Sequence, residues 1–560
     1  MGTISDKLMR IINTKEDIRQ ALISKGYDVP TSIPFKEYAK MISDLPCRVD
    51  SFPDIEGIVA RYSALGLTNE QMATNPVWVD KTGNGHDLQL KNFVWKGMSG
   101  VGGYGDENYQ TFYKFTLDDY VFIASPPGVK HMNFTFRVTG LQPGNKLTLA
   151  FFGTTNTVYG TWDKDGIYTV DADIVEAGKP TYFYNGYGAT RGEFTIEILP
   201  LYPGALVFDG VDDYGTCNNF PVLTKEKGYT VVALRQWIEE KNDSTALVSN
   251  CKNWNQDGAF LFEYNNLRIN FLNVAISFGH VSSVDRGKSP FSYQTSKLYN
   301  GKNIEPGSFI GSNELVVGKG NKDFPTVSKV AIWELIILDH DATEEELTEI
   351  KNYFVKTYPW LFFDQAWTVT GKTNEDEDRA TIANITGNGN DLVLSNFGFI
   401  EGSGYNEEGQ YAGYLVTDGV DDKIASSDFK MGKDFTIVGD WKFIDNKKSG
   451  TGLVKGSSFY IYNTMIGLDL YINSGSVKNS LDGIKSINAA CSDGRAYDRN
   501  WNEILANTGN AVGSGGMLEV SSSGGRFDLI AFKNLAIYPR ILSKDDCIKA
   551  YNYLQTLKAK

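Results

Sequence analysis

The chain has 560 residues, of which 41% are hydrophobic and 13% aromatic, a composition that excludes a disordered protein and allows several folded domains. Its formal net charge of −14 and its lack of Lys and Arg clusters argue against a nucleic-acid partner, and the lack of any run of about 18 apolar residues argues against membrane insertion. Its five cysteines are scattered without Cys-x-x-Cys spacing, which favours synthesis in a reducing cytosol over a disulfide framework or a thiolate zinc site.

Residues 1–47 are predicted to form short helices. Thr14 and Asp17 resemble a capping box, Gly26 suits a left-handed helix end, and Pro34 fits the first turn of a second helix. A segment this small cannot bury enough apolar surface to fold alone. We therefore expect it to dock as an anchor on a partner, on another copy of itself or on the body of the chain.

The rest of the chain carries one pattern twice. Residues 82–93, Thr-Gly-Asn-Gly-His-Asp-Leu-Gln-Leu-Lys-Asn-Phe, return at 386–397 as Thr-Gly-Asn-Gly-Asn-Asp-Leu-Val-Leu-Ser-Asn-Phe. The motif Asp-Gly-Val-Asp-Asp at 209–213 returns at 418–422. Each copy then closes with an alternating apolar strand that runs into a short helix. The order of these landmarks predicts a tandem duplication of one fold.

The spacing of the landmarks predicts an inserted domain in the first copy. The starts of the two repeated motifs are 127 residues apart in the first copy and 32 residues apart in the second. The extra segment, about 97–203, contains Met132, Phe134 and Phe136 in alternation with polar residues, which is typical of a strand with one buried face. We expect a separate, smaller β-sandwich there.

Short β-branched and aromatic runs, separated by Asn-Gly, Asp-Gly and Gly-Asn steps, are the layout of antiparallel sandwiches with tight turns. The sequence therefore predicts an all-β protein with a short helical segment at its N-terminus. Its predicted units are the helical anchor at 1–47, a first sandwich at 50–96 plus 204–360, an inserted sandwich at 97–203 and a second sandwich at 361–560.

Four landmarks of the first copy occur in a characteristic order. They are Phe-Asp-Gly-Val-Asp-Asp-Tyr at 208–214, Tyr-Thr-Val-Val-Ala at 229–233, a glycine-bearing strand at 315–318 and a final apolar strand at 332–338. This order resembles the laminin-G-like, concanavalin A-like jelly roll, and the second copy resembles the same family. The resemblance implies two jelly-roll sandwiches and indicates little about function.

The N-terminal segment carries a second resemblance. Residues 15–26, Lys-Glu-Asp-Ile-Arg-Gln-Ala-Leu-Ile-Ser-Lys-Gly, and 34–42, Pro-Phe-Lys-Glu-Tyr-Ala-Lys-Met-Ile, are similar to the N-terminal segments of tail and fibre proteins in tailed phages, notably those of gut Bacteroidales. This implies a virion protein that is made in the host cytoplasm and attached to other virion proteins through residues 1–47. It also implies a homo-oligomer such as a trimer, with the sandwiches facing the host.

The duplicated Asp-Gly-Val-Asp-Asp motif offers Asp212, Asp213, Asp421 and Asp422 as calcium ligands, because calcium prefers carboxylate oxygens. The alternative is a tight turn in which these carboxylates accept backbone N–H bonds. The turn is favoured, since the motif lacks the glycine and glutamate positions of an EF-hand. No cofactor is predicted, except that calcium remains an alternative at these turns.

The sequence offers no recognisable catalytic set. Jelly-roll glycosidases of the laminarinase kind place carboxylates on one strand as Glu-x-Asp-x-x-Glu, and this triplet is absent. No Gly-x-Ser-x-Gly elbow occurs, and His86, one of four histidines, is replaced by Asn390 in the second copy. We therefore predict that the chain is not an enzyme.

Glycan binding needs aromatic rings beside Asn, Asp or Gln side chains. Two predicted loops supply such residues, Trp254, Asn255 and Asp257 in one and Tyr497, Asn500 and Trp501 in the other. In each loop the alternative is an aromatic ring that packs against the sandwich.

The predicted function is therefore a phage virion structural protein, in a fibre, spike or other appendage, whose lectin-like domains adhere to a host surface polysaccharide or glycoprotein. One alternative is a purely structural or decoration protein that binds other virion proteins. A second alternative is an enzyme that degrades capsular polysaccharide.

Overall fold

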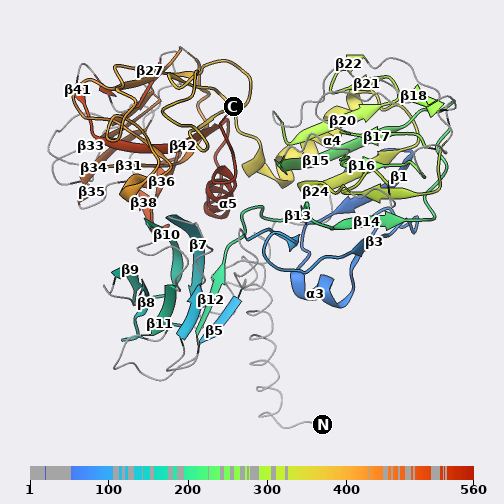
Figure 1. The fold of residues 1–560 in the computed structure, drawn as a ribbon, viewed down its shortest axis with the longest axis horizontal. Helices are drawn as coiled ribbons and strands as arrows, with labels where there is room; N and C mark the ends of the chain where they lie inside the picture. Colours follow the sequence, from blue (N-terminus) through green and yellow to red (C-terminus); the bar gives the residue numbers. More distant parts are fainter. Residues whose placement is uncertain are drawn as a thin grey trace, which may run out of the picture. The chain divides into compact units, whose positions relative to one another are not determined.

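A computed structural model of the chain describes most residues from Phe52 onward (Figure 1). Of the predicted anchor at 1–47 it describes Lys15 and Arg19, both in helix. Met1–Asp54 and Ile55–Lys560 are two separate compact units, and all the sandwiches belong to the second. The described residues are 15, 19, 52–104, 112–115, 120–123, 131–141, 143–151, 157–173, 181–185, 194–224, 226–239, 245–252, 258–264, 272–273, 276–277, 289–303, 311–321, 326–427, 429–444, 452–455, 458–463, 467–472, 481–482, 486–505, 517–520, 522–523 and 526–559.

The first sandwich consists of two antiparallel sheets around one apolar core (Figure 1). In β3 the side chains of Leu88 and Leu90 are buried while Gln89 and Lys91 are exposed, so alternate residues fill the core. One sheet has, in spatial order, β22 (Lys302–Asn303), β21 (Leu298–Tyr299), β20 (Phe291–Thr295), β15 (Thr230–Glu239), β24 (Lys329–Leu338), β13 (Leu206–Asp209) and β4 (Gly100–Val101), with β1 (Ile58–Ser63) also on β24. The other has β17 (Leu261–Phe262), β16 (Val248–Ser249), β23 (Leu315–Val317), β14 (Tyr214–Cys217), β3 (Leu88–Lys91) and β2 (Val77–Trp78). Outside these sheets lie α3 (Asn69–Thr74) and the pair β18 (Leu272–Asn273) and β19 (Ile276–Ser277).

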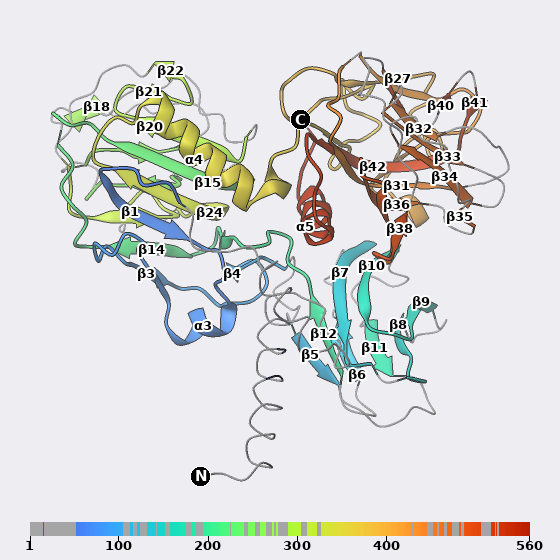
Figure 2. The ribbon, with the colours of Figure 1, turned by 180° about the vertical axis from the view of Figure 1, so that it is seen from behind.

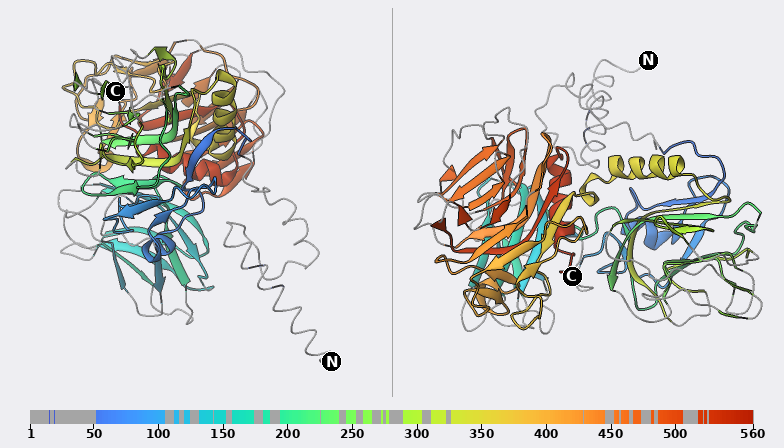
Figure 3. Two further views of the ribbon diagram at one scale, coloured as in Figure 1. Left: turned by 90° about the vertical axis from the view of Figure 1, so that its right-hand side faces the viewer. Right: turned by 90° about the horizontal axis from the view of Figure 1, so that it is seen from above.

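Strand β24 is buried on both faces. Leu335 points into the core, whereas Glu334 on the opposite face accepts hydrogen bonds from the Arg61 guanidinium and from the Tyr358 hydroxyl, the latter at 2.8 Å. Helix α4 (Glu344–Thr357) covers this outer face (Figure 2), as the view from above also shows (Figure 3). A helix on the outer face explains why the strand reads as a continuous apolar run rather than an alternating one.

The inserted sandwich is smaller and has its own aromatic core. In β12 the side chains of Phe194, Ile196 and Ile198 are buried, which is the alternation that the sequence shows. Phe136 lies at the centre, with the Trp162 ring centroid 4.9 Å from its own. One sheet has the order β10 (Gly166–Asp173), β7 (His131–Thr139), β12 (Phe194–Ile198) and β5 (Phe112–Phe115). The other has β6 (Tyr120–Ile123), β11 (Thr181–Asn185), β8 (Leu147–Phe151) and β9 (Thr157–Trp162).

The second sandwich again has two antiparallel sheets around an apolar core. One sheet has the order β28 (Gly404–Asn406), β29 (Tyr414–Val416), β42 (Ile530–Tyr538), β31 (Thr436–Phe443), β36 (Ile487–Cys491), β37 (Arg495–Asp498) and β38 (Glu503–Leu505), with β25 (Gln365–Thr368) also on β42. The other has β26 (Thr381–Ile382), β27 (Leu392–Ser395), β30 (Lys423–Ser426), β39 (Leu518–Val520), β32 (Gly452–Lys455), β33 (Phe459–Asn463), β34 (Gly467–Ile472) and β35 (Leu481–Asp482). The remaining elements are η1 (Pro359–Leu361), η2 (Gly409–Tyr411), β40 (Ser522–Ser523), β41 (Arg526–Phe527) and α5 (Lys544–Leu554).

The two larger sandwiches agree in strand register as well as in order. Thr230 pairs with Leu338 at the start of the β15–β24 ladder, and Thr436 pairs with Tyr538 at the start of the β31–β42 ladder. Both ladders contain a β-bulge after the fifth pair, before Arg235 in one and before Trp441 in the other. The prediction of an all-β fold built from sandwiches is confirmed.

The inserted sandwich leaves the first sandwich and returns to it between two paired strands. Val101 of β4 lies opposite Leu206 of β13. In the second sandwich Tyr405 of β28 lies opposite Leu415 of β29, and residues 407–413 join these strands directly. The insertion therefore occupies the place of a short hairpin loop.

Helix α5 packs against both larger sandwiches. On its own sandwich it contacts β31 and β42. Toward the first sandwich, the Tyr553 ring lies edge-on to Trp333 at 5.9 Å between centroids, and Asn552 donates a hydrogen bond to the carbonyl oxygen of Pro200 at 3.2 Å. Among the described helices, none is long and apolar enough to cross a membrane.

Candidate functional site

The Asp-Gly-Val-Asp-Asp motif of the first copy forms the turn between β13 and β14. The Asp209 carboxylate accepts the backbone N–H of Val211 at 2.7 Å, and the Asp213 carboxylate accepts the backbone N–H of Asp209 at 3.1 Å. Gly210 has a φ of +77°, which a glycine adopts without strain. The carboxylates therefore hold the turn in shape, as the turn interpretation of the sequence expects.

The second copy repeats this geometry between β29 and β30. Asp418 accepts the backbone N–H of Val420 at 2.8 Å, and Asp422 accepts the backbone N–H of Asp418 at 2.8 Å. The other carboxylate oxygen of Asp422 accepts a hydrogen bond from the Ser403 hydroxyl at 3.1 Å. The duplication thus extends to individual hydrogen bonds.

Each turn brings three carboxylates close enough together to bind one cation. Oxygens of the three acids in each turn lie within 4.8 Å of one another, namely Asp209, Asp212 and Asp213 in one turn and Asp418, Asp421 and Asp422 in the other. Carboxylate oxygens are the donors that calcium prefers, but it takes roughly six to eight oxygens, and several oxygens here already accept backbone N–H bonds. Water would have to supply most of the remaining ligands of a calcium ion at these turns.

The innermost acid of each turn is strongly affected by burial. Burial, followed by the charge of Asp209, raises the pKa of Asp213 to about 7, although the Ser99 hydroxyl opposes this shift. Burial also raises the pKa of Asp422. Near neutral pH the Asp213 carboxyl is therefore partly protonated, and a bound cation would favour its charged form.

A second segment of each copy is joined to the turn. The Asn92 side-chain amide donates a hydrogen bond to the carbonyl oxygen of Asp212 at 3.0 Å, and Asn396 does the same to Asp421 at 3.0 Å. Both asparagines have a positive φ, 69° and 68°. We define the rim of the first sandwich as residues 92–101 with 209–213, and the rim of the second as residues 396–405 with 418–422.

Each rim holds an aromatic residue in a strained backbone conformation. Trp95 has a φ of 57° and Phe399 a φ of 51°, values that bulky residues rarely adopt. A glycine five residues later packs closely against this backbone in each rim, because a Cβ on Gly100 would lie 3.0 Å from the Cα of Trp95, and a Cβ on Gly404 would lie 2.9 Å from the Cα of Phe399. Strain kept at the same place in both copies is a feature of functional sites.

The rims also expose apolar and acidic side chains together. In each rim the valine of the turn and one residue next to the strained aromatic, before it in the first rim and after it in the second, are largely exposed, as are the middle acid of the turn and the asparagine that binds it. The exposed fractions are 75% for Val211, 54% for Val94, 67% for Val420 and 65% for Ile400. Apolar and aromatic surface beside carboxylate and amide groups is the chemistry that recognises sugars.

The two rims differ in what lies against the aromatic residue. Trp95 stacks on Phe93, with 4.8 Å between centroids and 18° between planes. Phe399 stacks on Tyr405 at 6.4 Å, and the Arg379 guanidinium lies 5.1 Å from the centroid of the Phe399 ring. Phe397 also lies beside Phe399, with 6.0 Å between ring centroids, so both rims contain an aromatic pair and the second rim adds a positive charge.

The two loops that the sequence predicts to bind glycans are not part of the rims. Trp254, Asn255 and Asp257 lie outside the described residues. Asn500 is exposed, but Tyr497 and Trp501 are fully buried, so the prediction of an aromatic platform there is wrong.

The physical reason is that Trp501 packs between other parts of the chain. Its indole N–H donates to the Thr169 hydroxyl of the inserted sandwich at 3.3 Å, and its ring lies edge-on to Tyr551 of α5 at 5.7 Å. The loop is shaped by Asp498, whose carboxylate accepts the backbone N–H of Asn500 at 2.8 Å. The Trp501 side chain of this loop therefore contacts the inserted sandwich and α5 rather than solvent.

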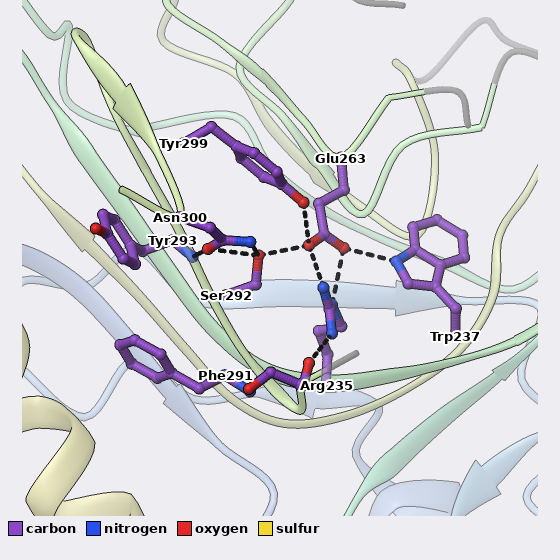
Figure 4. Close-up of polar contacts among 9 residues, drawn as sticks. Arg235, Trp237, Glu263, Phe291, Ser292, Tyr293, Tyr299 and Asn300 are labelled. Carbon is purple, nitrogen blue, oxygen red and sulfur yellow. Dashed lines mark hydrogen bonds and ion pairs between the residues drawn. The ribbon is translucent and has the colours of Figure 1, made fainter. Parts of the chain in front are cut away.

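A buried ion pair lies inside the first sandwich (Figure 4). The Glu263 carboxylate pairs with the Arg235 guanidinium and accepts further hydrogen bonds from the Trp237 indole at 2.6 Å, the Ser292 hydroxyl at 2.6 Å and the Tyr299 hydroxyl at 3.2 Å. Burial opposes ionisation, but the charge of Arg235 and the hydrogen bonds from Arg235, Ser292 and Trp237 together outweigh it and hold the pKa of Glu263 below its usual range. A buried carboxylate that its counter-ion and its hydrogen bonds hold in the charged form stabilises the core and is not suited to donate a proton to a substrate.

The comparisons with known proteins give distant similarities. No protein-family model matches the chain, and no curated protein matches it. Among solved structures it is similar to a Trypanosoma rangeli sialidase in complex with sialic acid, with 10% identity over 76% of this chain and 78% of that chain and a TM-score of 0.24. It is also similar to the botulinum neurotoxin serotype D binding domain, with 10% identity over 62% of this chain and 89% of that chain and a TM-score of 0.23.

These similarities correct one prediction. Sialidases are enzymes, so the prediction that the chain is not an enzyme is contradicted and is withdrawn. At TM-scores this low, the likeness carries no argument about a reaction, and no activity is assigned from it.

Proposed function

We propose that the two larger sandwiches bind glycans through their rims and that the chain is an adhesion component of a tailed-phage virion. The observation that carries the proposal is the duplicated rim. In both copies an asparagine donates the same hydrogen bond to the acidic turn, a strained aromatic residue follows three positions later, and apolar side chains beside them are exposed.

The charge of the rims favours one class of sugar. Each rim contains three clustered carboxylates, and the whole chain carries a net charge of −14. Like charges disfavour sugars that carry carboxylate or sulfate groups. The proposed ligands are therefore neutral or amino sugars, with Asp212 and Asp421 accepting hydrogen bonds from hydroxyl or ammonium groups and Trp95 and Phe399 contacting the apolar ring face.

The virion part of the proposal is supported by the resemblance of residues 15–26 and 34–42 to phage tail and fibre proteins. Attachment through residues 1–47 and assembly into a homo-oligomer such as a trimer belong to the same proposal. Two rims per chain, multiplied by an oligomer, would give strong attachment from individually weak sites. Mass spectrometry of purified virions from the source phage tests this part, and absence of the chain from the particles would overturn it.

Glycan binding is tested with the full chain on immobilised neutral, amino and acidic polysaccharides. We expect Asp212→Asn with Asp421→Asn to weaken binding about tenfold or more, since a charged acceptor is lost from each site. Glu345→Gln, an exposed acid on α4, is the matched control and should bind like the parent chain.

Two outcomes would replace the proposal by an alternative. If no glycan binds while the chain binds a purified virion protein tightly, it is a structural or decoration protein. If new reducing ends appear when the chain is incubated with purified capsule, the bound glycan is also cleaved.

A further inference from the structure

Two of the scattered cysteines meet in the second sandwich. Cys491 is the last residue of β36, and Cys547 lies one turn into α5. Both are free thiols with fully buried side chains. The Cys491 thiol donates to the carbonyl oxygen of Leu542, just before α5, at 3.9 Å, and the two thiol groups are close enough to affect each other's pKa. The sequence gives no sign of this pair, because strand and helix bring together residues far apart in the chain.

The surroundings make the two thiols unequal. Cys491 accepts a hydrogen bond from the Thr436 hydroxyl at 3.6 Å, and the Arg495 guanidinium lies close enough to donate to the carbonyl oxygen of Leu542 beside it. The hydrogen bond from Cys547 lowers the pKa of Cys491, whereas the same contact raises the pKa of Cys547. Cys491 is therefore the sulfur that ionises first.

The first sandwich shows that the fold does not require cysteine at either position. Thr436 pairs with Cys491 in the second sandwich, and Thr230 pairs with Thr295 at the same place in the first. Both helices begin in the same way, and the residue four positions after the N-cap is Leu347 in α4 and Cys547 in α5. Two facing positions that carry Thr and Leu in one copy carry two thiols in the other.

We propose that Cys491 and Cys547 are a redox pair that closes to a disulfide between β36 and α5 when the chain meets an oxidising environment. The proposed function enters only here, because a virion leaves the reducing cytosol in which it is made. The disulfide would hold α5 on its own sandwich, and with it the Tyr553 and Asn552 contacts to the first sandwich.

The reaction is a thiol–disulfide exchange with a small disulfide such as oxidised glutathione. The Cys491 thiolate attacks one sulfur of glutathione disulfide and releases one glutathione thiolate. The Cys547 thiolate then attacks the Cys491 sulfur of this mixed disulfide and releases the second glutathione. The two protein thiols lose two electrons and two protons, and the glutathione disulfide gains them and becomes two molecules of reduced glutathione. Because both sulfurs are buried, the exchange takes place when the first turn of α5 opens.

The test uses the full chain, reduced first and then equilibrated with oxidised and reduced glutathione. We expect the intact mass to fall by two hydrogens, and non-reducing peptide mapping to find Cys491 linked to Cys547. The Tm of the oxidised chain should exceed that of the reduced chain by several degrees. Cys251→Ala, a buried thiol elsewhere, is the matched control and should keep both results.

The double variant Cys491→Thr, Cys547→Leu takes the residues of the first copy and should lose the redox dependence of Tm. If both thiols stay free in oxidised glutathione, including after a cycle of unfolding and refolding, the proposal is wrong. A link from either cysteine to Cys217 would also overturn it. None of these readouts depends on glycan binding, so the proposed function can fail while this proposal stands, and the reverse.

Discussion

The two larger sandwiches share register and turns but fill one part of their cores with opposite chemistry. After the common β-bulge, the first sandwich places Arg235 and Trp237 toward Glu263, whereas the second places Trp441 and Phe443 into an apolar cluster. The backbone hydrogen bonds of the two ladders are equivalent. The strand pattern and the turns therefore determine this fold, and the core tolerates either filling as long as every buried polar group has a partner.

The largest expected effect comes from breaking the ion pair. Glu263→Gln leaves the buried Arg235 charge without its counter-ion and should destabilise the first sandwich by about 3–5 kcal/mol. Chemical denaturation of the full chain should show an earlier transition for one part of the signal. Glu345→Gln is the control, and a Glu263→Gln curve that overlays this control would contradict the assignment.

A second variant sharpens the same comparison. Arg235→Met with Glu263→Met replaces the ion pair by apolar side chains, as in the second sandwich, and should recover most of the stability lost in Glu263→Gln. If the double variant is less stable than Glu263→Gln, then the polar contacts of Trp237, Ser292 and Tyr299 matter more than the charge pair.

The two acidic turns should respond to pH in the same direction. The pKa of Asp213 rises from its ordinary value to about 7 on folding, so its protonated form stabilises the fold at low pH, and this stabilisation is lost as pH rises through about 7. Relative to Asp213→Asn, the parent chain should lose about 2–4 kcal/mol of unfolding free energy between pH 5 and pH 8. Urea denaturation of both chains at the two pH values measures this loss.

Asp422→Asn provides the comparison in the second sandwich, where burial also raises the pKa of the acid. Added calcium should reverse the loss at pH 8 if the turns bind it, because a cation favours the charged carboxylate. Parallel stability curves for the parent and Asp213→Asn would show that Asp213 is not buried as described.

The smallest expected effect concerns the asparagines that join the rim segments. Asn92→Ala and Asn396→Ala each lose one hydrogen bond and place alanine at a positive φ, which should destabilise each sandwich by about 1–2 kcal/mol. Glycine adopts a positive φ without strain, so Asn92→Gly and Asn396→Gly should lower the free energy of unfolding by less than the alanine variants. Equal losses for Ala and Gly would assign the whole effect to the hydrogen bond.

Much of the fold follows from local patterns in the sequence. Alternation in β12 and in β3 predicts which side chains are buried, and the repeated Asp-Gly-Val-Asp-Asp motif predicts the turn that its carboxylates hold. These features depend on neighbours a few residues apart. The rims are not among the sites predicted from the sequence. The repeat of Asn92 as Asn396, after the Gly-Asn-Gly turn of each copy, is the sequence signal that points to them.

Other features depend on contacts between distant segments and have no local signal. Glu263 meets Arg235 only after two strands pair, and Cys491 meets Cys547 only after α5 docks. The polar residues that flank Trp501 predict a surface aromatic, yet its indole N–H donates a hydrogen bond to Thr169, far away in sequence. Polar neighbours in the sequence indicate that a loop is exposed. They do not indicate whether one aromatic side chain of that loop points inward.

The hairpin position of the inserted sandwich makes it an exchangeable cassette. Its two ends are neighbouring strands, with Val101 opposite Leu206, so replacing everything between them leaves the ladder of the first sandwich intact. Residues 407–413 of the second sandwich show how short such a replacement can be. Lengthening a loop costs little closure entropy, so grafts of different size can be accepted there and the outward surface can diversify without refolding its support.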